Sequence, residues 1–379
     1  MQAARADRSG RVRLARVRQN PLRRSRDARP GPAGTPGPSS PRLKDLRMDT
    51  LTLRLRLKAP FGSPLLGDML FGQLCWALRN RHGEMRLQEA LDGYTAGHPF
   101  AVVSDAMPVG WLPRPALPLS LFSEITDGDR KQIKKRQWLP VAALGQPIRA
   151  WLALCRSEAE LLADHQAADA SRSRPREHPT ALSALHPQPH NSINRITGTT
   201  GRGDFAPYTL MQRWYAEGAD LCLRVVHDAE RISADTLTAL FDDIGSVGFG
   251  RDASVGLGKF AIEPLPETWP AAQADANACL TLAPCAPQGL GFDAARSFYD
   301  VFTRFGRHGD QAVYQGNPFK APVLLARAGA LLTPTTLPAA PIVGQGLGGE
   351  GRLSKVISAT VHQGYAPCVA VHLPAEMVP

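Results

Sequence analysis

Several features that mark common protein classes are missing from this 379-residue sequence. It contains no apolar run long enough to span a membrane, so we expect no membrane-spanning helix and no membrane partner. Its six cysteines form no Cys-x-x-Cys pair, and no secretory signal precedes them. Reduced thiols in a cytoplasmic protein are therefore the expected state and location.

The motifs of common enzymes and metal sites are missing too. There is no Gly-x-Ser-x-Gly nucleophile elbow and no compact Asp/Glu cluster for two-metal chemistry. His186 and His190 are four residues apart, but Pro187 and Pro189 rule out the helix that would place both on one face. We therefore expect no metal and no cofactor. His190 is the best-placed general base for metal-free cleavage of RNA, but a lone loop histidine more often only forms hydrogen bonds, and we expect no catalysis.

Acidic residues are scarce only at the start of the chain. The net charge is +10, and the first fifty residues hold 13 Lys/Arg and 4 Asp/Glu, which leaves a net charge of only +1 for the remainder. The high isoelectric point is thus a property of the N-terminal segment. It is not evidence that the folded part binds nucleic acid, and any basic surface there must be local.

Residues 1–47 lack hydrophobic periodicity and are rich in Arg, then in Pro, Gly and Ser. This composition predicts a disordered extension. A basic RNA-binding arm and a targeting peptide are two functional interpretations. We favour a third, in which translation naturally begins at Met48, just before the first clear strand.

The remaining chain predicts an α+β fold. Residues 51–58 alternate as a strand, with leucines inward and Thr52, Arg54, Arg56 and Lys58 outward. Asp68 is expected to cap the helix that follows, and Ser233 to cap a helix with apolar residues 237, 240, 241 and 244 on one side. Further strands are expected over 100–103, 148–154 and 221–226, and a mobile loop or insertion over 158–189.

A Pro-rich join near residues 264–270 predicts a domain boundary. Beyond it we expect a strand over 278–282, a helix over 293–305, and one or two short strands over 323–332. Residues 344–351 are expected to form a second glycine loop. Strands over 356–361 and 368–373, separated by Gly364 and Tyr365, are expected to close the fold.

The chain is organised around residues 245–260, where glycines alternate with cations and a serine. Glycine lets another backbone come close, while cations, hydroxyls and bare N–H groups bind phosphates. The predicted order is helix, loop, strand, the reverse of common nucleotide-binding loops, and Ala253 and Phe260 break the Walker A pattern. We therefore favour contact with a phosphate backbone over a flexible connector. The candidate residues are Gly245, Gly248, Gly250, Arg251, Ser254, Gly256, Gly258 and Lys259.

Two further stretches have the composition of RNA-contacting segments. Lys134 and Lys135 belong to the densest basic cluster of the body, next to Trp138, which suits RNA and a solvated helix face equally. Residues 190–204 combine amides, hydroxyls, arginines and glycines and predict a β-hairpin with a polar tip. That hairpin presses into a nucleic-acid backbone or is a surface hairpin without a ligand.

Taken together, these stretches resemble a known family. Residues 51–58, 63–67 and 68–74 resemble the N-terminal signature of CRISPR-associated RAMP proteins. Residues 134–140, 191–197, 245–260 and 364–367 resemble the fourth subunit of the type III-A Csm effector. Each motif alone has low specificity. The resemblance depends on their order and spacing over residues 48–379.

The resemblance implies two ferredoxin-like (RRM-like) domains, over 48–265 with insertions and over 275–379. It implies a non-catalytic antiviral subunit that grips the 5′ handle of the crRNA and contacts the large polymerase-like subunit and the backbone RAMP subunit. The glycine loop would hold handle phosphates. The hairpin would be a thumb that kinks the guide–target duplex, and His190, Asn191, Asn194 and Arg195 are its candidate RNA contacts. One alternative is a metal-independent RAMP endoribonuclease that processes pre-crRNA. Another is a scaffold whose glycine loop only packs against a partner subunit.

Overall fold

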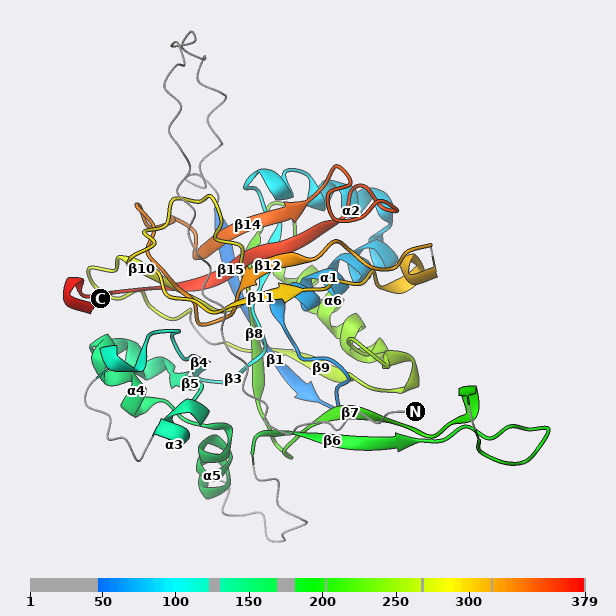
Figure 1. Cartoon of the computed structure of the whole chain (residues 1–379). Coiled ribbons are helices and arrows are strands. Elements are labelled where there is room, and N and C mark those ends of the chain that lie inside the picture. Colours follow the sequence, from blue (N-terminus) through cyan, green and yellow to red (C-terminus); the bar gives the residue numbers. More distant parts are fainter. Residues whose placement is uncertain are drawn as a thin grey trace, which may run out of the picture. The chain divides into compact units, whose positions relative to one another are not determined.

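The computed structural model describes residues 47–122, 130–168, 181–201, 203–266, 269–314 and 316–377. The predicted N-terminal extension lies outside these residues, apart from Arg47. The described chain is a mixed α/β structure with several small antiparallel sheets and few helices, in line with the predicted α+β class (Figure 1). In this part of the chain, no helix combines the length and apolar character that crossing a membrane requires.

The first sheet has the strand order β2-β8-β1-β9, with β3 also paired to β8. Its strands are β1 (Met48–Leu57), β2 (Ala101–Val103), β3 (Met107–Pro108), β8 (Leu221–Asp228) and β9 (Phe260–Pro264). The strands predicted over 51–58, 100–103 and 221–226 are thereby confirmed. Leu53 and Leu55 of β1 are fully buried, whereas Arg54 and Arg56 both lie within ion-pair distance of Asp220. The outward cations of β1 therefore have acidic neighbours within the protein.

Three helices share the core of this sheet. They are α1 (Gly67–His82), α2 (Glu84–Leu91) and α6 (Ala234–Val247). The predicted cap of α6 is confirmed, because the Thr236 N–H donates to Ser233 Oγ at 3.2 Å. The apolar stripe of α6 is buried as expected, and the chain then passes through the glycine loop into β9. The predicted order of helix, loop and strand is correct.

Residues 107–215 hold short elements and one long hairpin. They are β4 (Trp111–Pro113), α3 (Arg130–Lys135), β5 (Trp138–Pro140), α4 (Trp151–Leu154), α5 (Glu158–Ala168), β6 (Ser183–His190) and β7 (Tyr208–Tyr215). The strand predicted over 148–154 is wrong, because a helical turn and α4 form there and bury Trp151, whose Nε1–H donates to the Gln146 carbonyl. The loop predicted over 158–189 is wrong at both ends, where α5 and β6 lie. Residues 169–180 are not described.

The second sheet has the order β13-β10-β15-β14, and a separate two-stranded ribbon pairs β11 with β12. The strands are β10 (Ala278–Thr281), β11 (Val301–Arg304), β12 (Val323–Ala326), β13 (Leu331–Leu332), β14 (Ile342–Gly348) and β15 (Val361–Val371). The strands predicted over 278–282 and 323–332 are confirmed. One sheet thus lies on each side of the predicted boundary, while the division into two ferredoxin-like domains stays a prediction.

Three predictions for this half are wrong. The second glycine loop expected over 344–351 is for the most part strand, because β14 continues to Gly348 and pairs with β15. The helix expected over 293–305 is absent, because Phe298 bridges to Leu331 and β11 pairs with β12 in register. The closing strands are not split by a turn, since β15 runs continuously through Gly364. A Cβ on that glycine would lie 2.4 Å from the Gln345 carbonyl oxygen, so the glycine serves close strand packing. Of the strand expected over 356–361, only Val361 is extended.

Buried polar contacts join α1 to the second half. Arg304 binds the Asp68 carboxylate through Nε at 2.7 Å and a terminal nitrogen at 3.1 Å, and His362 Nε2 lies 3.2 Å from it. Burial by itself raises the pKa of Asp68, but His362 and Arg304 outweigh it and hold that pKa below its ordinary value. The predicted capping role of Asp68 is therefore wrong, because its side chain is buried in this ion pair and Leu66 occupies the N-cap position.

Candidate nucleic-acid interface

Backbone hydrogen bonds hold the two ends of the glycine loop together. α6 ends where the Gly248 N–H donates to the Ile244 carbonyl at 2.8 Å. The Phe249 N–H donates to the Gly258 carbonyl at 2.9 Å, and the Gly258 N–H donates to the Pro60 carbonyl at 2.8 Å. The Phe249 side chain is fully buried beneath the loop. The loop is therefore a folded structure with a fixed base.

Glycine is required in this base by space as well as by conformation. Gly248 and Gly258 have φ of 115° and 73°. A Cβ at Gly258 would lie 2.2 Å from the Phe249 carbonyl oxygen, and one at Gly248 would lie 2.4 Å from the Leu257 carbonyl oxygen. Gly245 meets β9 in the same way, since its Cβ would lie 2.3 Å from the Phe260 carbonyl oxygen. These three glycines are buried and shape the loop.

The rim of the loop is exposed and polar. Arg251, Ser254 and Lys259 are all exposed, as is Val255. Gly256 has φ of 100°, and a Cβ there would meet open space. Among the described residues, the side chains of Ser254 and Lys259 have no partner, so both are available to a ligand.

Arg251 is partly committed within the protein. Its guanidinium donates to the Met211 carbonyl on β7 at 2.7 Å and pairs with Asp252 at 3.2 Å. Its backbone N–H donates to Ser63 Oγ at 3.0 Å. A Cβ at Gly62 would lie 2.4 Å from the Arg251 carbonyl oxygen. Arg251 therefore ties the glycine loop to the hairpin and to residues 60–63.

The predicted hairpin is confirmed, with β6 and β7 paired in register from Ser183–Tyr215 to His190–Tyr208. The pair runs away from the first sheet toward a polar turn (Figure 1). The His190 ring stacks on Tyr208 with centroids 5.1 Å apart and an interplanar angle of 10°. Residue 202 of the tip is not described.

The candidate residues of the hairpin tip have different settings. Asn194 is occupied by the turn itself, since its Oδ1 accepts the Ile196 N–H at 2.9 Å. Asn191 and Arg195 are exposed, as are Ile193 and Ile196. The tip thus presents polar and apolar side chains together, and Asn194 shapes it.

Lys134 and Lys135 lie apart from this region. They are exposed on α3, which Figure 1 places well away from the glycine loop between α6 and β9. The Trp138 that follows is half-buried and packs against the core. The fold therefore brings the glycine loop and the hairpin base together and leaves the basic cluster separate. The prediction did not include Gly62 and Ser63 as site residues, although both lie just before or within the motif at 63–67.

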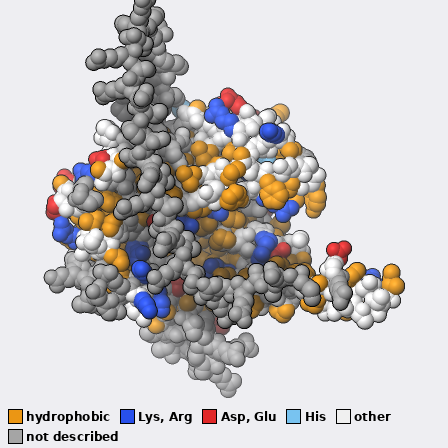
Figure 2. Space-filling view, in the orientation of Figure 1, with side chains coloured by type: hydrophobic (Ala, Val, Ile, Leu, Met, Phe, Trp, Pro, Cys, Tyr) orange, Lys and Arg blue, Asp and Glu red, His pale blue; other side chains and the backbone are white. Residues whose placement is uncertain are grey.

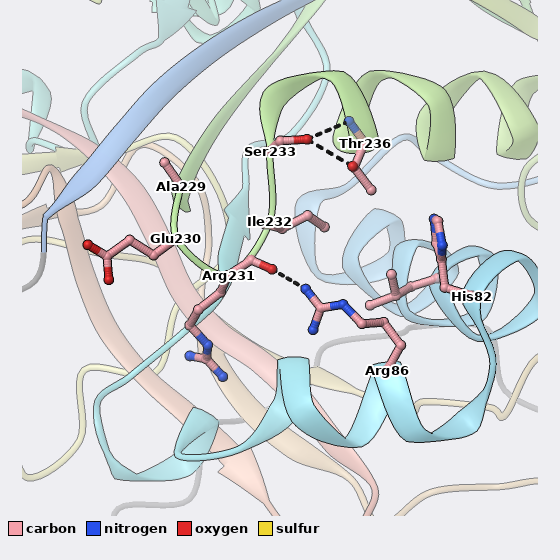
Figure 3. Close-up of a pocket in the computed structure, with 9 residues that line it drawn as sticks. His82, Arg86, Ala229, Glu230, Arg231, Ile232, Ser233 and Thr236 are labelled. Carbon is pink, nitrogen blue, oxygen red and sulfur yellow. Dashed lines mark hydrogen bonds between the residues drawn. The ribbon is translucent and has the colours of Figure 1, made fainter.

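A cavity of about 260 Å³ lies at the opposite end of α6 and is bounded by the groups that hold α2 and α6 together (Figure 3). Arg231 donates to the carbonyls of His98, Glu89, Ala90 and Asp92. Arg86 donates to the Arg231 carbonyl, and Ser233 caps α6. Four of its polar residues, Arg86, Arg231, Ser233 and Thr236, are thus engaged in the fold. Within the described residues, no cluster of three or more His, Cys, Asp or Glu is arranged to hold a metal ion.

No protein-family model matches the sequence, and no curated protein matches it. Solved structures do. A chain in the crystal structure of a Csm1–Csm4 cassette with pppApA matches with a TM-score of 0.52 and 15% identity, over 86% of this chain and 100% of that one. The same cassette with AMPPNP matches with a TM-score of 0.51 and 15% identity, over 86% and 99%. A chain of a Csm3–Csm4 subcomplex of the type III-A CRISPR-Cas interference complex matches with a TM-score of 0.50 and 12% identity, over 82% and 99%.

Csm4 is the component common to these assemblies. The fold is that of a Csm4-like RAMP protein. The resemblance noted in the sequence motifs is therefore confirmed at the level of the fold. At identities of 12–15%, the similarity extends only to the fold. What this chain binds must therefore be inferred from its own loop and hairpin.

Proposed function

We propose that the chain is a non-catalytic RNA-binding subunit of a type III-A CRISPR (Csm) effector complex in antiviral defence. It grips the 5′ handle of the crRNA and contacts a large polymerase-like subunit and a backbone RAMP subunit. The observation that carries this proposal is the glycine loop on a Csm4-like fold. Its base is fixed by backbone contacts, while Ser254 and Lys259 face outward without partners among the described residues.

This arrangement suits a phosphate backbone. Cations and hydroxyls on a rigid loop neutralise and hydrogen-bond phosphate oxygens without reading base identity. Arg251 adds positive charge at the same rim, and its contact with Met211 holds the hairpin base beside the loop. An RNA strand on the rim would therefore lie next to β7, with target RNA near the hairpin tip.

The choice of these two partner subunits is based on the fold. The similar structures are a Csm1–Csm4 cassette and a Csm3–Csm4 subcomplex, so a chain with this fold would occupy the corresponding place between two such partners. Exposed apolar side chains outside the glycine loop, including Met85 and Leu290, provide surface for such contacts.

The test is to incubate the full chain with labelled repeat-derived RNA in a chelator and to run native and denaturing gels in parallel. We expect a shifted band in the native gel and intact RNA in the denaturing gel. Cut RNA would instead identify a metal-independent processing nuclease and make His190→Ala the next variant. An RNA that is neither shifted nor cut, with and without the two partner subunits, would overturn the proposal.

A further inference from the structure

The β11–β12 ribbon has one face packed on the protein and one face free. Successive residues of a strand point to opposite sides. On the inner side, Leu325 is fully buried and Arg304 binds the buried Asp68 carboxylate. On the outer side, Val301 and Leu324 are 56% and 50% exposed. The inner contacts hold this ribbon rigidly against α1 and leave its outer face open.

The ribbon continues beyond the two strands and becomes aromatic. The Lys320 N–H donates to the Gly306 carbonyl at 2.9 Å, and Arg307 bridges to Phe319. Phe305 and Phe319 are 76% and 64% exposed. Figure 2 shows apolar side chains gathered over β11, β12 and the segment that joins them. Two large rings therefore lie on the free side, with Arg307 opposite Phe319.

The ribbon itself carries only cations, with the exposed Asp300 and Asp310 at the borders of its first segment. Residues 301–309 and 316–327 contain no acidic residue, and the exposed Arg307 lies opposite Phe319. Arg327 stacks on Phe302 at the other end of the ribbon. A second cation near the rings comes from a neighbouring segment. His308 Nε2 lies 2.9 Å from Ser354 Oγ, which brings the exposed Lys355 to the ribbon. Exposed rings with nearby cations are the combination that binds single-stranded nucleic acid.

The ribbon is connected to the glycine loop by one short path. Ser63 accepts the Arg251 N–H, and the chain from Ser63 leads directly into α1. Asp68, in the first turn of α1, then binds Arg304, the residue before Phe305. The glycine loop and the inner face of the ribbon are therefore both anchored at the start of α1, while Phe305 lies on the opposite face of the ribbon.

We propose that Phe305 and Phe319 form a base-stacking platform for single-stranded RNA, in addition to the phosphate contacts of the glycine loop. The inference rests on the proposed function, because it requires RNA on that loop. It extends the RNA-binding surface to the second half of the chain. Docking of a protein partner on the same face is the competing outcome, but exposed cations without acidic residues in the ribbon favour a polyanion.

The test compares the full chain with Phe305→Leu/Phe319→Leu, which keeps an apolar face and removes both rings. Binding of a fluorescein-labelled single-stranded repeat RNA is followed by anisotropy at about 0.15 M salt. We expect the double variant to bind at least about tenfold more weakly, because each stacked base contributes on the order of one factor of ten. The salt dependence should stay unchanged, because no cation is lost.

The matched control is Val301→Ala/Leu324→Ala, which alters the same face without touching a ring and should bind like the unchanged protein. Unchanged affinity in the leucine variant would overturn the platform.

The failure of the platform can be told apart from the failure of the proposed function. If Arg251→Ala/Lys259→Ala weakened binding while the leucine variant did not, the platform would be overturned and the proposed function would be retained. If Phe305→Glu/Phe319→Glu lost a co-expressed Csm partner while the leucine variant kept RNA affinity, the face would be a protein-docking surface. Absence of RNA binding by the unchanged chain would overturn both proposals.

Discussion

At the scale of single residues, the glycine loop separates side chains that build the fold from side chains that face outward. Gly245, Gly248 and Gly258 lie against backbone atoms, where a side chain has no room. Ser254 and Lys259 face solvent. Arg251 belongs to both groups, because it binds Met211 and Asp252 and is still exposed. Substitutions at these positions should therefore have different consequences for stability and for RNA binding.

Removing the exposed cations should change how RNA binding depends on salt. In Arg251→Ala/Lys259→Ala, the slope of log affinity against log salt should fall by about 1.4, because each phosphate contact on a single strand contributes about 0.7. Titrations at several salt concentrations provide the measurement. Lys134→Ala/Lys135→Ala removes the same charge from α3 and should leave the slope nearly unchanged. A larger effect from that second pair would move the RNA contacts to α3.

Two glycines of the loop should respond differently to alanine. Both have positive φ, which costs a non-glycine residue about 1–3 kcal/mol. Gly256→Ala meets open space, so that strain is its whole cost, whereas Gly258→Ala also forces a Cβ to 2.2 Å from the Phe249 carbonyl oxygen. Urea denaturation should show a clearly larger loss for Gly258→Ala. Equal losses would mean that the loop base moves to admit the methyl group.

At the scale of elements, the sequence predicted those with strong local signals. The alternation of β1 and the capped, periodic α6 both carry their pattern within a few residues, and both were correct. The glycine loop was recognised from composition alone. Its contact with Ser63, 188 residues away in sequence, has no local signal, so the other wall of the site was not predicted.

The elements that were predicted incorrectly are those whose conformation depends on contacts with residues far away in the sequence. Residues 293–305 carry apolar side chains at spacings that fit a helix, but β-branched Val301 and Thr303 also suit a strand, and pairing with β12 selects the strand. Gly364 predicted a turn because glycine is common in turns. In the structure it lies inside β15, where close packing against the neighbouring strand leaves no room for a side chain. The position of Asp68 just before a helix predicted an N-cap. Its side chain is instead buried because it binds Arg304, which lies far away in the sequence.

The junction around α1 should make stability depend on pH. Asp105 accepts the Gly67 N–H at 2.7 Å. Burial raises the pKa of Asp105 from 3.8 to about 8, with Asp68 adding to the rise and the Gly67 N–H and Arg304 opposing it. The unfolded chain thus releases this proton near pH 4 and the folded chain near pH 8. Between those values the unfolded state holds fewer protons, so the contribution of Asp105 to the free energy of unfolding falls as pH rises.

Asp105→Asn keeps an acceptor for the Gly67 N–H and removes the titration. We expect the unchanged protein to lose more stability than this variant between about pH 5 and about pH 8, as measured by urea midpoints at both values. Identical pH dependence in the two proteins would show that Asp105 titrates at its ordinary value in the folded chain.

At the scale of the whole molecule, side chains of the second half reach into the first. Gln363 on β15 accepts the Val103 N–H at 2.9 Å and donates to the Val103 carbonyl at 2.8 Å. Tyr365 donates to the Tyr94 carbonyl at 2.8 Å. Both side chains are buried. These contacts, with the Asp68–Arg304 pair, fix the first sheet and α1 against β15, so a ligand can be held by both halves at once.

The charge of the molecule is concentrated before residue 50, which gives a prediction for the N-terminal segment. A chain that begins at Met48 should bind repeat-derived RNA with nearly the affinity of the full chain at about 0.15 M salt, because the proposed phosphate contacts lie in the glycine loop. Parallel anisotropy titrations of the two proteins provide the measurement. A loss of about tenfold or more would support an RNA-binding arm.

The central claim is that RNA lies along the glycine loop, and mapping of cross-links tests it most directly. Repeat-derived RNA that carries 4-thiouridine would be bound to the full chain, irradiated and digested, and the attached peptides identified by mass spectrometry. We expect cross-links in residues 248–259 and in β6–β7, with loss of the loop cross-links in Arg251→Ala/Lys259→Ala. Cross-links confined to residues 1–47 or to α3 would contradict it.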